Sequence, residues 1–395
     1  MSTMSIPAEQ EPSSTFESHS EGVSHEQEKK FTYTTPKRSQ THRSRPFDQD
    51  SVNYNALQDI SNSLMGVPSL ERDPAQLVQT LHHHASLDRI LSEEDKDEWV
   101  KSKISLIRSI HDNIVGGEAV FKTPFSRNRF LPITYADYIA SGKPLKFIED
   151  YLFEQVLPTY ANTHTTSSFT GFQTTHFREE AREIIAGCVN AKLKKKVTSH
   201  CSMCSISDVK EDSNDDDCDV VLFEGSGSTS AINTIVHCIG VRERVLLARS
   251  QAEIPVIFIS PYEHHSNILP WRESGALVVQ ISEDKYGNLN IQDLKKCLET
   301  YKNSGRLLIG SFSAASNVTG VITDCDAVCK LCHENGALCF FDYAASAPYV
   351  PIDMNPTDDP LLHKDAIFIS PHKFVGGPGT PGILVAKRKL FKNGM

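Results

Sequence analysis

Long apolar runs are missing from this sequence. No stretch approaches the ~18 consecutive apolar residues that a membrane-spanning helix needs, so we expect no membrane partner. The first residues contain no secretory signal, and they have too many glutamates and too few arginines for a mitochondrial presequence. The ten cysteines are irregularly spaced, which is typical of a reducing compartment. We therefore expect a cytoplasmic protein.

An excess of positive charge is also absent. Forty Lys and Arg residues stand against fifty Asp and Glu residues, which gives a formal net charge of -10. The one compact basic run, residues 192–196, is soon followed by the acidic run 215–217. Because no basic stripe would compensate the phosphate charge, nucleic acid is not an expected partner.

The N-terminal part has little apolar periodicity. Residues 1–68 are rich in Ser, Glu, Gln, Thr, His and Pro, a composition that cannot offset its ordering entropy, and they are predicted to be a disordered tail. Residues 69–130 are predicted to be a helical lead-in, because isoleucines recur at intervals of three and four between 104 and 114. Further helices are expected at about 144–156 and 177–189.

Beyond residue 219 the pattern changes to short apolar strands that alternate with amphipathic helices. This alternation predicts an α/β fold with a mostly parallel central sheet flanked by helices. The expected strands are 220–223, 256–260, 276–281, 307–311, 338–341, 366–369 and 382–386. The expected helices include 228–239, 291–301 and 325–335. Residues 199–217 lack periodicity and are predicted to be a surface insertion.

Ligands of an open parallel sheet bind outside the carboxyl ends of its strands, so the residues directly after each strand are informative. The first strand is followed by Glu-Gly-Ser-Gly-Ser-Thr-Ser at 224–230. The start of the next helix, with Ser228 and Thr229, could hold a phosphate group at its positive end. Taken alone, such a turn is more often a structural helix cap.

Two later strands are followed by His264 and Asn317. His264, in Glu-His-His-Ser-Asn, could stack on an aromatic cofactor and move protons near neutral pH, or form an ordinary surface pair with His265. Asn317, in Ser-Asn-Val-Thr-Gly, could donate to a phenolate oxygen, or be an ordinary turn residue.

The last two expected sites are a carboxylate and a lysine. Asp342 follows a buried strand, where a carboxylate needs a cationic partner such as a protonated pyridine nitrogen. Lys373, in Ser-Pro-His-Lys, precedes the glycine-rich run 376–379. A lysine in such an apolar setting can lose its proton and form a Schiff base, and glycines allow a ligand to approach the backbone.

The ordered set of these elements resembles the class V aminotransferases, which are fold-type I enzymes dependent on pyridoxal 5'-phosphate (PLP). Glu-His-His-Ser-Asn and Ser-Pro-His-Lys are similar to the cysteine desulfurase and selenocysteine lyase branch. The resemblance covers about residues 132–387, including Tyr-Ala-Asp-Tyr-Ile-Ala-Ser-Gly at 135–142 and Asn-Thr-His-Thr at 162–165. It implies that residues 131–395 form the PLP-binding domain.

The resemblance also implies a role for each matching residue. Lys373 would be the Schiff-base lysine and proton shuttle, Asp342 would pair with the pyridinium, His264 would stack on the ring and Asn317 would contact the phenolic oxygen. The phosphate would be held by Ser228, Thr229, Ser370 and His372. Ala140 and His164 would lie near the substrate entrance. The implied partners are an amino-acid substrate and a second copy of the chain, because fold-type I active sites usually lie at a dimer interface.

The sequence departs from the desulfurase pattern in three places, one of which is the surface insertion 199–217, to which the family gives no role. Ala345 stands where that branch usually has a glutamine, three residues after the aspartate. The chain also ends soon after Lys373, where the family continues into a C-terminal small domain that supplies the substrate-binding arginine and the persulfide cysteine. We therefore expect an incomplete enzyme of this family, whose activity is in doubt.

Two cysteine patterns are not expected to bind cofactors. His-Cys-Ser-Met-Cys at 200–204 could be half of a zinc site, but no second pair lies nearby, so no metal is expected. Cys-Lys-Leu-Cys-His at 329–333 matches a c-type haem attachment pattern, but it falls inside a predicted helix and is interpreted as accidental.

Three functional hypotheses follow. The first is a PLP-dependent, desulfurase-like enzyme that removes sulfur or selenium from an amino acid. The second is another class V reaction, such as transamination or a kynureninase-like cleavage. The third is a truncated, non-catalytic chain.

Overall fold

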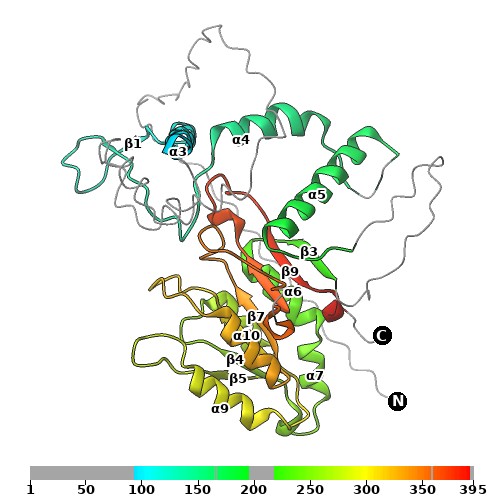
Figure 1. The fold of residues 1–395 in the computed structure, drawn as a ribbon. Helices are drawn as coiled ribbons and strands as arrows, with labels where there is room; N and C mark the ends of the chain where they lie inside the picture. The colour runs from blue at the N-terminus through cyan, green and yellow to red at the C-terminus, as the bar shows by residue number, and fades with distance from the viewer. Residues whose placement is uncertain (1–92, 164, 166, 195–217, 357–358, 392–395) are drawn as a thin grey trace, which may run out of the picture. The chain divides into compact units, whose positions relative to one another are not determined.

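A computed structural model describes residues 93–163, 165, 167–194, 218–356 and 359–391 (Figure 1). The predicted disordered tail and the predicted insertion at 199–217 lie outside these residues, as do residues 69–92 of the predicted helical lead-in. Among the described helices, none is long and apolar enough to cross a membrane.

A mixed, mostly parallel sheet of seven strands forms the centre of the fold. Its order is β3-β9-β8-β7-β6-β4-β5. The strands are β3 (Asp219–Glu224), β4 (Val256–Ile259), β5 (Leu277–Gln280), β6 (Leu308–Ser313), β7 (Leu338–Asp342), β8 (Ala366–Ile369) and β9 (Gly382–Lys387). Strand β9 runs antiparallel to both of its neighbours, β3 and β8, and the other pairs are parallel. The predicted fold class and the seven predicted strands are confirmed.

Helices cover both faces of this sheet. The described helices of this region are α6 (Gly227–Cys238), α7 (Val241–Leu247), α8 (Leu269–Glu273), α9 (Ile291–Tyr301) and α10 (Cys325–Glu334). Buried residues of α9 and α10 share one core cluster, and those of α6, α7 and α8 share another. Successive residues of β4 alternate between the two clusters, as the side-chain period of a strand requires. The sheet is therefore buried on both faces.

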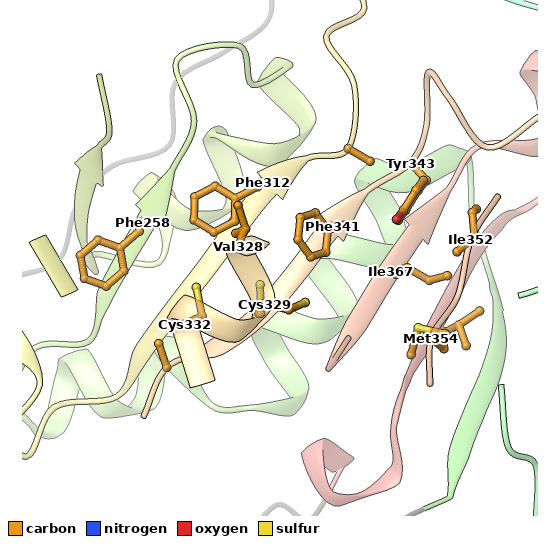
Figure 2. Packing of buried hydrophobic residues seen from close by; sticks show 14 of the residues in the cluster. Phe258, Phe312, Val328, Cys329, Cys332, Phe341, Tyr343, Ile352, Met354 and Ile367 are labelled. Carbon is orange, nitrogen blue, oxygen red and sulfur yellow. The ribbon is translucent and has the colours of Figure 1, made fainter. Parts of the chain in front are cut away.

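Figure 2 shows the cluster on the α10 side, where Phe312 and Phe341 of neighbouring strands lie close to Val328, Cys329 and Cys332 of α10. All five side chains are fully buried. Burying one large apolar side chain contributes about 1.5–3 kcal/mol. This packing holds the strands in register, and it thereby fixes where their carboxyl ends meet.

The described part before the sheet combines helices with a short hairpin, and residues 114–130 of the predicted helical lead-in are not helical. It contains α3 (Glu93–Asn113), α4 (Lys146–Tyr151) and α5 (Phe169–Cys188), with a two-stranded hairpin of β1 (Val120–Phe121) and β2 (Leu131–Pro132). A π turn at Leu152–Val156 continues α4, so the helical stretch predicted for 144–156 is present with a change of geometry. Helix α5 begins eight residues before its predicted start, because Ser168 caps it by accepting a hydrogen bond from the Gly171 N–H.

Candidate active site

A cavity of about 620 Å³ lies at the carboxyl ends of the parallel strands. The sequence-predicted residues come together in it, although they are spread over more than 230 positions. Those that line the cavity are Ala140, Ser228, Thr229, His264, Asn317, Asp342, Ser370, His372 and Lys373. His164, the remaining predicted residue, lies outside the described residues. The roles assigned to all these residues remain predictions.

One wall of the cavity is the N-terminus of α6 packed against the turn after β8. The Ser228 N–H donates a 2.8 Å hydrogen bond to the Ser370 hydroxyl. Gly227 has a positive φ of 72°, and a Cβ there would lie 2.8 Å from Cε1 of His372, so only glycine allows this close approach. In the described structure, Ser226 at the N-cap makes no side-chain capping bond. The positive end of a twelve-residue helix and several hydroxyls thus face one corner, which suits an anion.

A short chain of hydrogen bonds positions His264. The Thr229 hydroxyl donates to Ser266 Oγ at 2.8 Å, and that Oγ lies 2.9 Å from Nδ1 of His264. Partial burial lowers the pKa of His264, and the charges of Lys373 and His265 lower it further. This lowering of the pKa favours the neutral form of the imidazole.

Asp342 and Lys373 face the cavity from the ends of adjacent strands, β7 and β8. The Asp342 carboxyl is 5% exposed and accepts a 2.9 Å hydrogen bond from the Ala344 N–H. Burial raises its pKa to about 7, the negative charge of Glu263 adds to this effect, and Lys373 opposes it. Burial also lowers the pKa of Lys373, although the Asp342 charge partly offsets this. Asp342 thus lacks sufficient cationic compensation, and Lys373 is less basic than an ordinary lysine.

Glu263 is a structural centre of the site that sequence reasoning missed. Its buried carboxylate accepts 2.7 Å hydrogen bonds from the Ser313 N–H, the Ser313 hydroxyl and the Asn267 amide, and it also accepts from Ser260. Burial raises the pKa of Glu263, and these hydrogen bonds oppose that rise. Glu263 therefore joins the ends of β4 and β6 directly before His264. Its only sequence signal was an acidic residue just after a buried strand.

The segment 135–142 closes another side of the cavity. The Gly142 N–H donates to the His372 carbonyl at 2.8 Å, and a Cβ at Gly142 would lie 1.7 Å from the Phe374 carbonyl oxygen. The Tyr135 hydroxyl donates to the Ser141 carbonyl at 2.8 Å and fixes the turn. This close backbone contact places Ala140 on the cavity wall, together with two residues that were not predicted, Asp137 and Ile139.

The lining residues fit PLP in three respects. The α6 terminus with Ser370 and His372 presents donors for a phosphate. Asp342 is a buried carboxylate whose raised pKa reflects the lack of a strong cationic partner, which a pyridinium would supply. Lys373 lines the same cavity, and burial lowers its pKa. Ala345 also lines the cavity. Its methyl group stands where the glutamine of the desulfurase branch would place an amide.

Comparisons with known proteins agree with this geometry. Residues 207–394 match the family model of aminotransferase class-V. A probable cysteine desulfurase of Halalkalibacterium halodurans is 28% identical over 265 residues, which cover 65% of this chain and 54% of that protein. A cysteine desulfurase of Synechococcus elongatus is 26% identical over 264 residues, 66% of this chain and 35% of that protein. The chain thus spans about half or less of the length of these curated relatives.

Among solved structures, the chain resembles an apo cysteine desulfurase from Thermococcus onnurineus with a TM-score of 0.50 and 22% identity. The match covers 72% of this chain and 57% of that one, and it shows a shared fold. The predicted resemblance to the class V aminotransferases is confirmed.

Proposed function

We propose that this chain, whose residues 207–394 match the aminotransferase class-V family, binds PLP in the 620 Å³ cavity and acts on an amino acid through Lys373. The observation that carries the proposal is that Asp342 and Lys373 line one cavity together with the α6 N-terminus. A carboxyl with a raised pKa and a lysine with a lowered pKa face one cavity from adjacent strands. Titratable groups shifted in this way gather at functional sites.

The phosphate end of the cofactor would bind at the α6 wall. Ser228 and Thr229 begin the helix, and Ser370 is already bonded to the Ser228 N–H. His372 lies against Gly227, close enough to add a donor. The hydrogen bond between Ser228 and Ser370 holds the two segments together, so this corner is organised before any ligand arrives.

The ring end would lie between His264 and Asp342. His264 is held in orientation by Ser266, and its neutral ring can stack on another ring. The Asp342 carboxylate would accept a hydrogen bond from the protonated ring nitrogen of the cofactor. The positive charge of that ring would lower the raised pKa of Asp342 toward its ordinary value. When bound, the cofactor supplies an electron sink for the bonds broken at the substrate's α-carbon. Asn317, on the cavity wall, would contact the phenolic oxygen.

Lys373 would hold the cofactor covalently and then move protons. Only a neutral amine has the lone pair that attacks a carbonyl carbon, and burial increases the neutral fraction of Lys373 by lowering its pKa. With PLP bound, Lys373 would also be the group that takes a proton from the substrate's α-carbon or returns one. The Asp342 charge limits how far the pKa of Lys373 falls.

For the reaction, we propose removal of sulfur or selenium from a cysteine-like substrate. The support is the presence of the motifs Glu-His-His-Ser-Asn and Ser-Pro-His-Lys in the sequence, together with relatives that are named cysteine desulfurases. Ala345 in place of glutamine favours the second candidate, another class V reaction such as transamination or a kynureninase-like cleavage. A non-catalytic chain that binds PLP without turnover is the third.

We also propose a homodimer. Large apolar side chains are exposed between the end of α4 and the start of α5, among them Phe153 at 73%, Tyr160 at 62% and Phe169 at 72%. Such exposure is typical of a surface that a partner covers. Sedimentation equilibrium of the purified chain tests this proposal: a mass of twice that of one chain supports the dimer, and the mass of a single chain at all concentrations contradicts it.

Product analysis distinguishes the three candidates. The full chain is supplied with PLP, a thiol reductant, a 2-oxo acid as amino acceptor and, separately, L-cysteine, L-selenocysteine, L-alanine or L-kynurenine. Alanine with sulfide or selenide supports the desulfurase-like reaction, a keto acid supports transamination, and anthranilate supports the kynureninase-like cleavage. Retained PLP without any product supports the non-catalytic chain. Lys373→Ala is the matched control, because the free cofactor alone reacts slowly with amino acids.

A further inference from the structure

A second cluster of titratable side chains lies at the end of β8 remote from Lys373. It consists of His333 in the last turn of α10, His363 directly after the 3-10 turn Pro360–Leu362, and Asp365 directly before β8. One nitrogen of each histidine and the carboxylate oxygens lie within 4.8 Å of one another. Nε2 of His333 is 2.9 Å from Oδ2 of Asp365, and Nε2 of His363 is 3.4 Å from Oδ1. The PLP-binding proposal uses none of these residues.

The other ring nitrogens decide the chemistry of this cluster. Nδ1 of His333 lies 2.7 Å from the Leu361 carbonyl oxygen, and Nδ1 of His363 lies 2.6 Å from the Pro360 carbonyl oxygen. A carbonyl oxygen only accepts, so each Nδ1 carries the hydrogen. In a neutral imidazole this leaves the Nε2 lone pair directed at the Asp365 carboxylate. A histidine whose second ring N–H is held by a backbone carbonyl is the usual arrangement around a protein-bound metal ion.

Interactions around the cluster hold it in place. Lys330 of α10 pairs with Asp359 at 2.9 Å, and Lys364 pairs with Asp326 of α10 at 3.1 Å. Both ion pairs tie the loop that bears His363 and Asp365 to α10. Asp365 is fully buried, and its Oδ2 also accepts from the Cys339 N–H at 3.0 Å. The His363 side chain is 26% exposed, which gives solvent access to the group.

Lys389 is the cation nearest to this carboxylate among the described residues, with Nζ 3.0 Å from Oδ1 of Asp365. It neutralises part of the Asp365 charge. The Lys389 ammonium group could donate a hydrogen bond to the Nε2 lone pair of one histidine, but the described structure shows no contact between Lys389 and either histidine ring. The Lys389 side chain is 43% exposed and can turn into solvent. A cation that contacts all three groups would satisfy both Nε2 atoms and the carboxylate together.

We propose that His333, His363 and Asp365 bind a divalent transition-metal ion, with zinc as the best match to two imidazoles and one carboxylate. Each Nε2 lies 2.9 or 3.4 Å from a different oxygen of Asp365, close to the roughly 3.3 Å that separates two ligands about 2.0–2.1 Å from a tetrahedral ion. The two imidazole rings are stacked with centroids 4.3 Å apart, so one ring must turn for both Nε2 atoms to face one ion. The ion joins α10 to the start of β8, the strand that leads to Ser370 and Lys373.

The sequence predicts no metal, whereas this proposal places one at His333. The residues of the Cys-Lys-Leu-Cys-His pattern lie in two different environments. Cys329 and Cys332 are free thiols buried in the core on the α10 side of the sheet (Figure 2), whereas His333 turns toward the loop before β8. Neither thiol belongs to the proposed metal site. A spectrum that distinguishes nitrogen and oxygen ligands from thiolate ligands can therefore distinguish this site from a metal site built on cysteines.

The experiment is a cobalt(II) titration of the full chain after chelator treatment, without PLP, followed by visible absorption and by competition with a chromophoric chelator. We expect one ion per chain, with the ligand-field bands of a nitrogen and oxygen site and without thiolate charge-transfer bands. His363→Ala should lower the affinity by ~10-fold or more. His237→Ala, at an exposed histidine in the last turn of α6, should leave the affinity unchanged. The Cys201→Ser and Cys204→Ser double variant should also bind normally.

A second variant keeps the test decisive if His363→Ala fails to fold, which circular dichroism of the metal-free protein shows. Lys389→Met removes the competing positive charge and should raise the affinity. Zinc should raise the thermal midpoint of the wild-type chain and of Lys389→Met, but not that of a folded His363→Ala. The proposal is overturned by no stoichiometric binding, by thiolate bands, or by equal affinity in a folded His363→Ala. If that variant is unfolded, an unchanged affinity in Lys389→Met overturns it.

Discussion

The backbone N–H of Ser228 donates a 2.8 Å hydrogen bond to the hydroxyl of Ser370, across 142 positions of the chain. Both residues are buried. This bond joins the first turn of α6 to the turn after β8, three residues before Lys373. The helix terminus proposed to bind the phosphate and the lysine proposed to hold the cofactor are therefore parts of one connected unit.

Ser370→Ala should weaken both the fold and cofactor binding. The substitution leaves the buried Ser228 N–H without its acceptor, which costs about 1–3 kcal/mol in the free energy of unfolding. Ser370→Thr keeps the hydroxyl and is the matched control. Urea unfolding measures the stability, and equilibrium dialysis measures PLP affinity. Equal stability and equal affinity in the two variants would show that the bond is unimportant.

Gly227→Ala should destabilise the protein more than Gly287→Ala does. Both glycines have positive φ, 72° and 81°, so both substitutions carry a backbone cost of about 1–2 kcal/mol. Only at Gly227 would the new Cβ meet close neighbours, at 2.8 Å from His372 Cε1 and 3.0 Å from Ser370 Oγ, whereas Gly287 has open space. The excess, roughly 1–3 kcal/mol for overpacking, is read from the two urea midpoints. No excess would mean that the α6 wall is looser than described.

Asp342→Asn should change how the stability of the PLP-free protein depends on pH. The folded-state pKa of Asp342 is raised to about 7 from 3.8. Between these values the folded wild type holds a proton that the unfolded chain has released, so its free energy of unfolding falls as pH rises. The asparagine variant lacks this loss, which is on the order of 4 kcal/mol at most.

Urea unfolding at pH 5 and pH 8 tests that prediction. Relative to the wild type, Asp342→Asn should be more stable at pH 8 than at pH 5, while its affinity for PLP should fall because it cannot pair with a positive ring nitrogen. Parallel stability curves for the two proteins would contradict the raised pKa of Asp342.

The sheet and its strand ends could be predicted because a strand that is buried on both faces appears in the sequence as a continuous apolar run. Strand β8 is buried throughout and reads as one apolar run, Ala366–Ile369, so its bounds were predicted correctly. Helix α9 was also predicted with its observed bounds, since Leu294 and Leu298 mark one apolar face four residues apart. With the strands located, the chemistry of the residues after them followed from where parallel strands end.

Other features depend on contacts that composition does not record. Strand β9 is apolar like its neighbours, and its antiparallel direction follows from the short connection after β8, which includes no α-helix. Glu263 looked like an ordinary acidic turn residue until Ser313, 50 positions away, was brought against it. The cluster of His333, His363 and Asp365 likewise forms only when α10 packs beside the loop before β8.

The central claim is that Lys373 holds PLP covalently, and borohydride trapping tests it most directly. The full chain is incubated with PLP, reduced with sodium borohydride, digested and mapped by mass spectrometry, with Lys373→Ala and an exposed-lysine variant, Lys295→Ala, in parallel. We predict one stoichiometric pyridoxyl-phosphate adduct on Lys373, retained in Lys295→Ala and lost in Lys373→Ala, together with the visible absorption of the bound cofactor. An adduct spread over surface lysines, or an equal yield in Lys373→Ala, would contradict the assignment of the cavity as a PLP site.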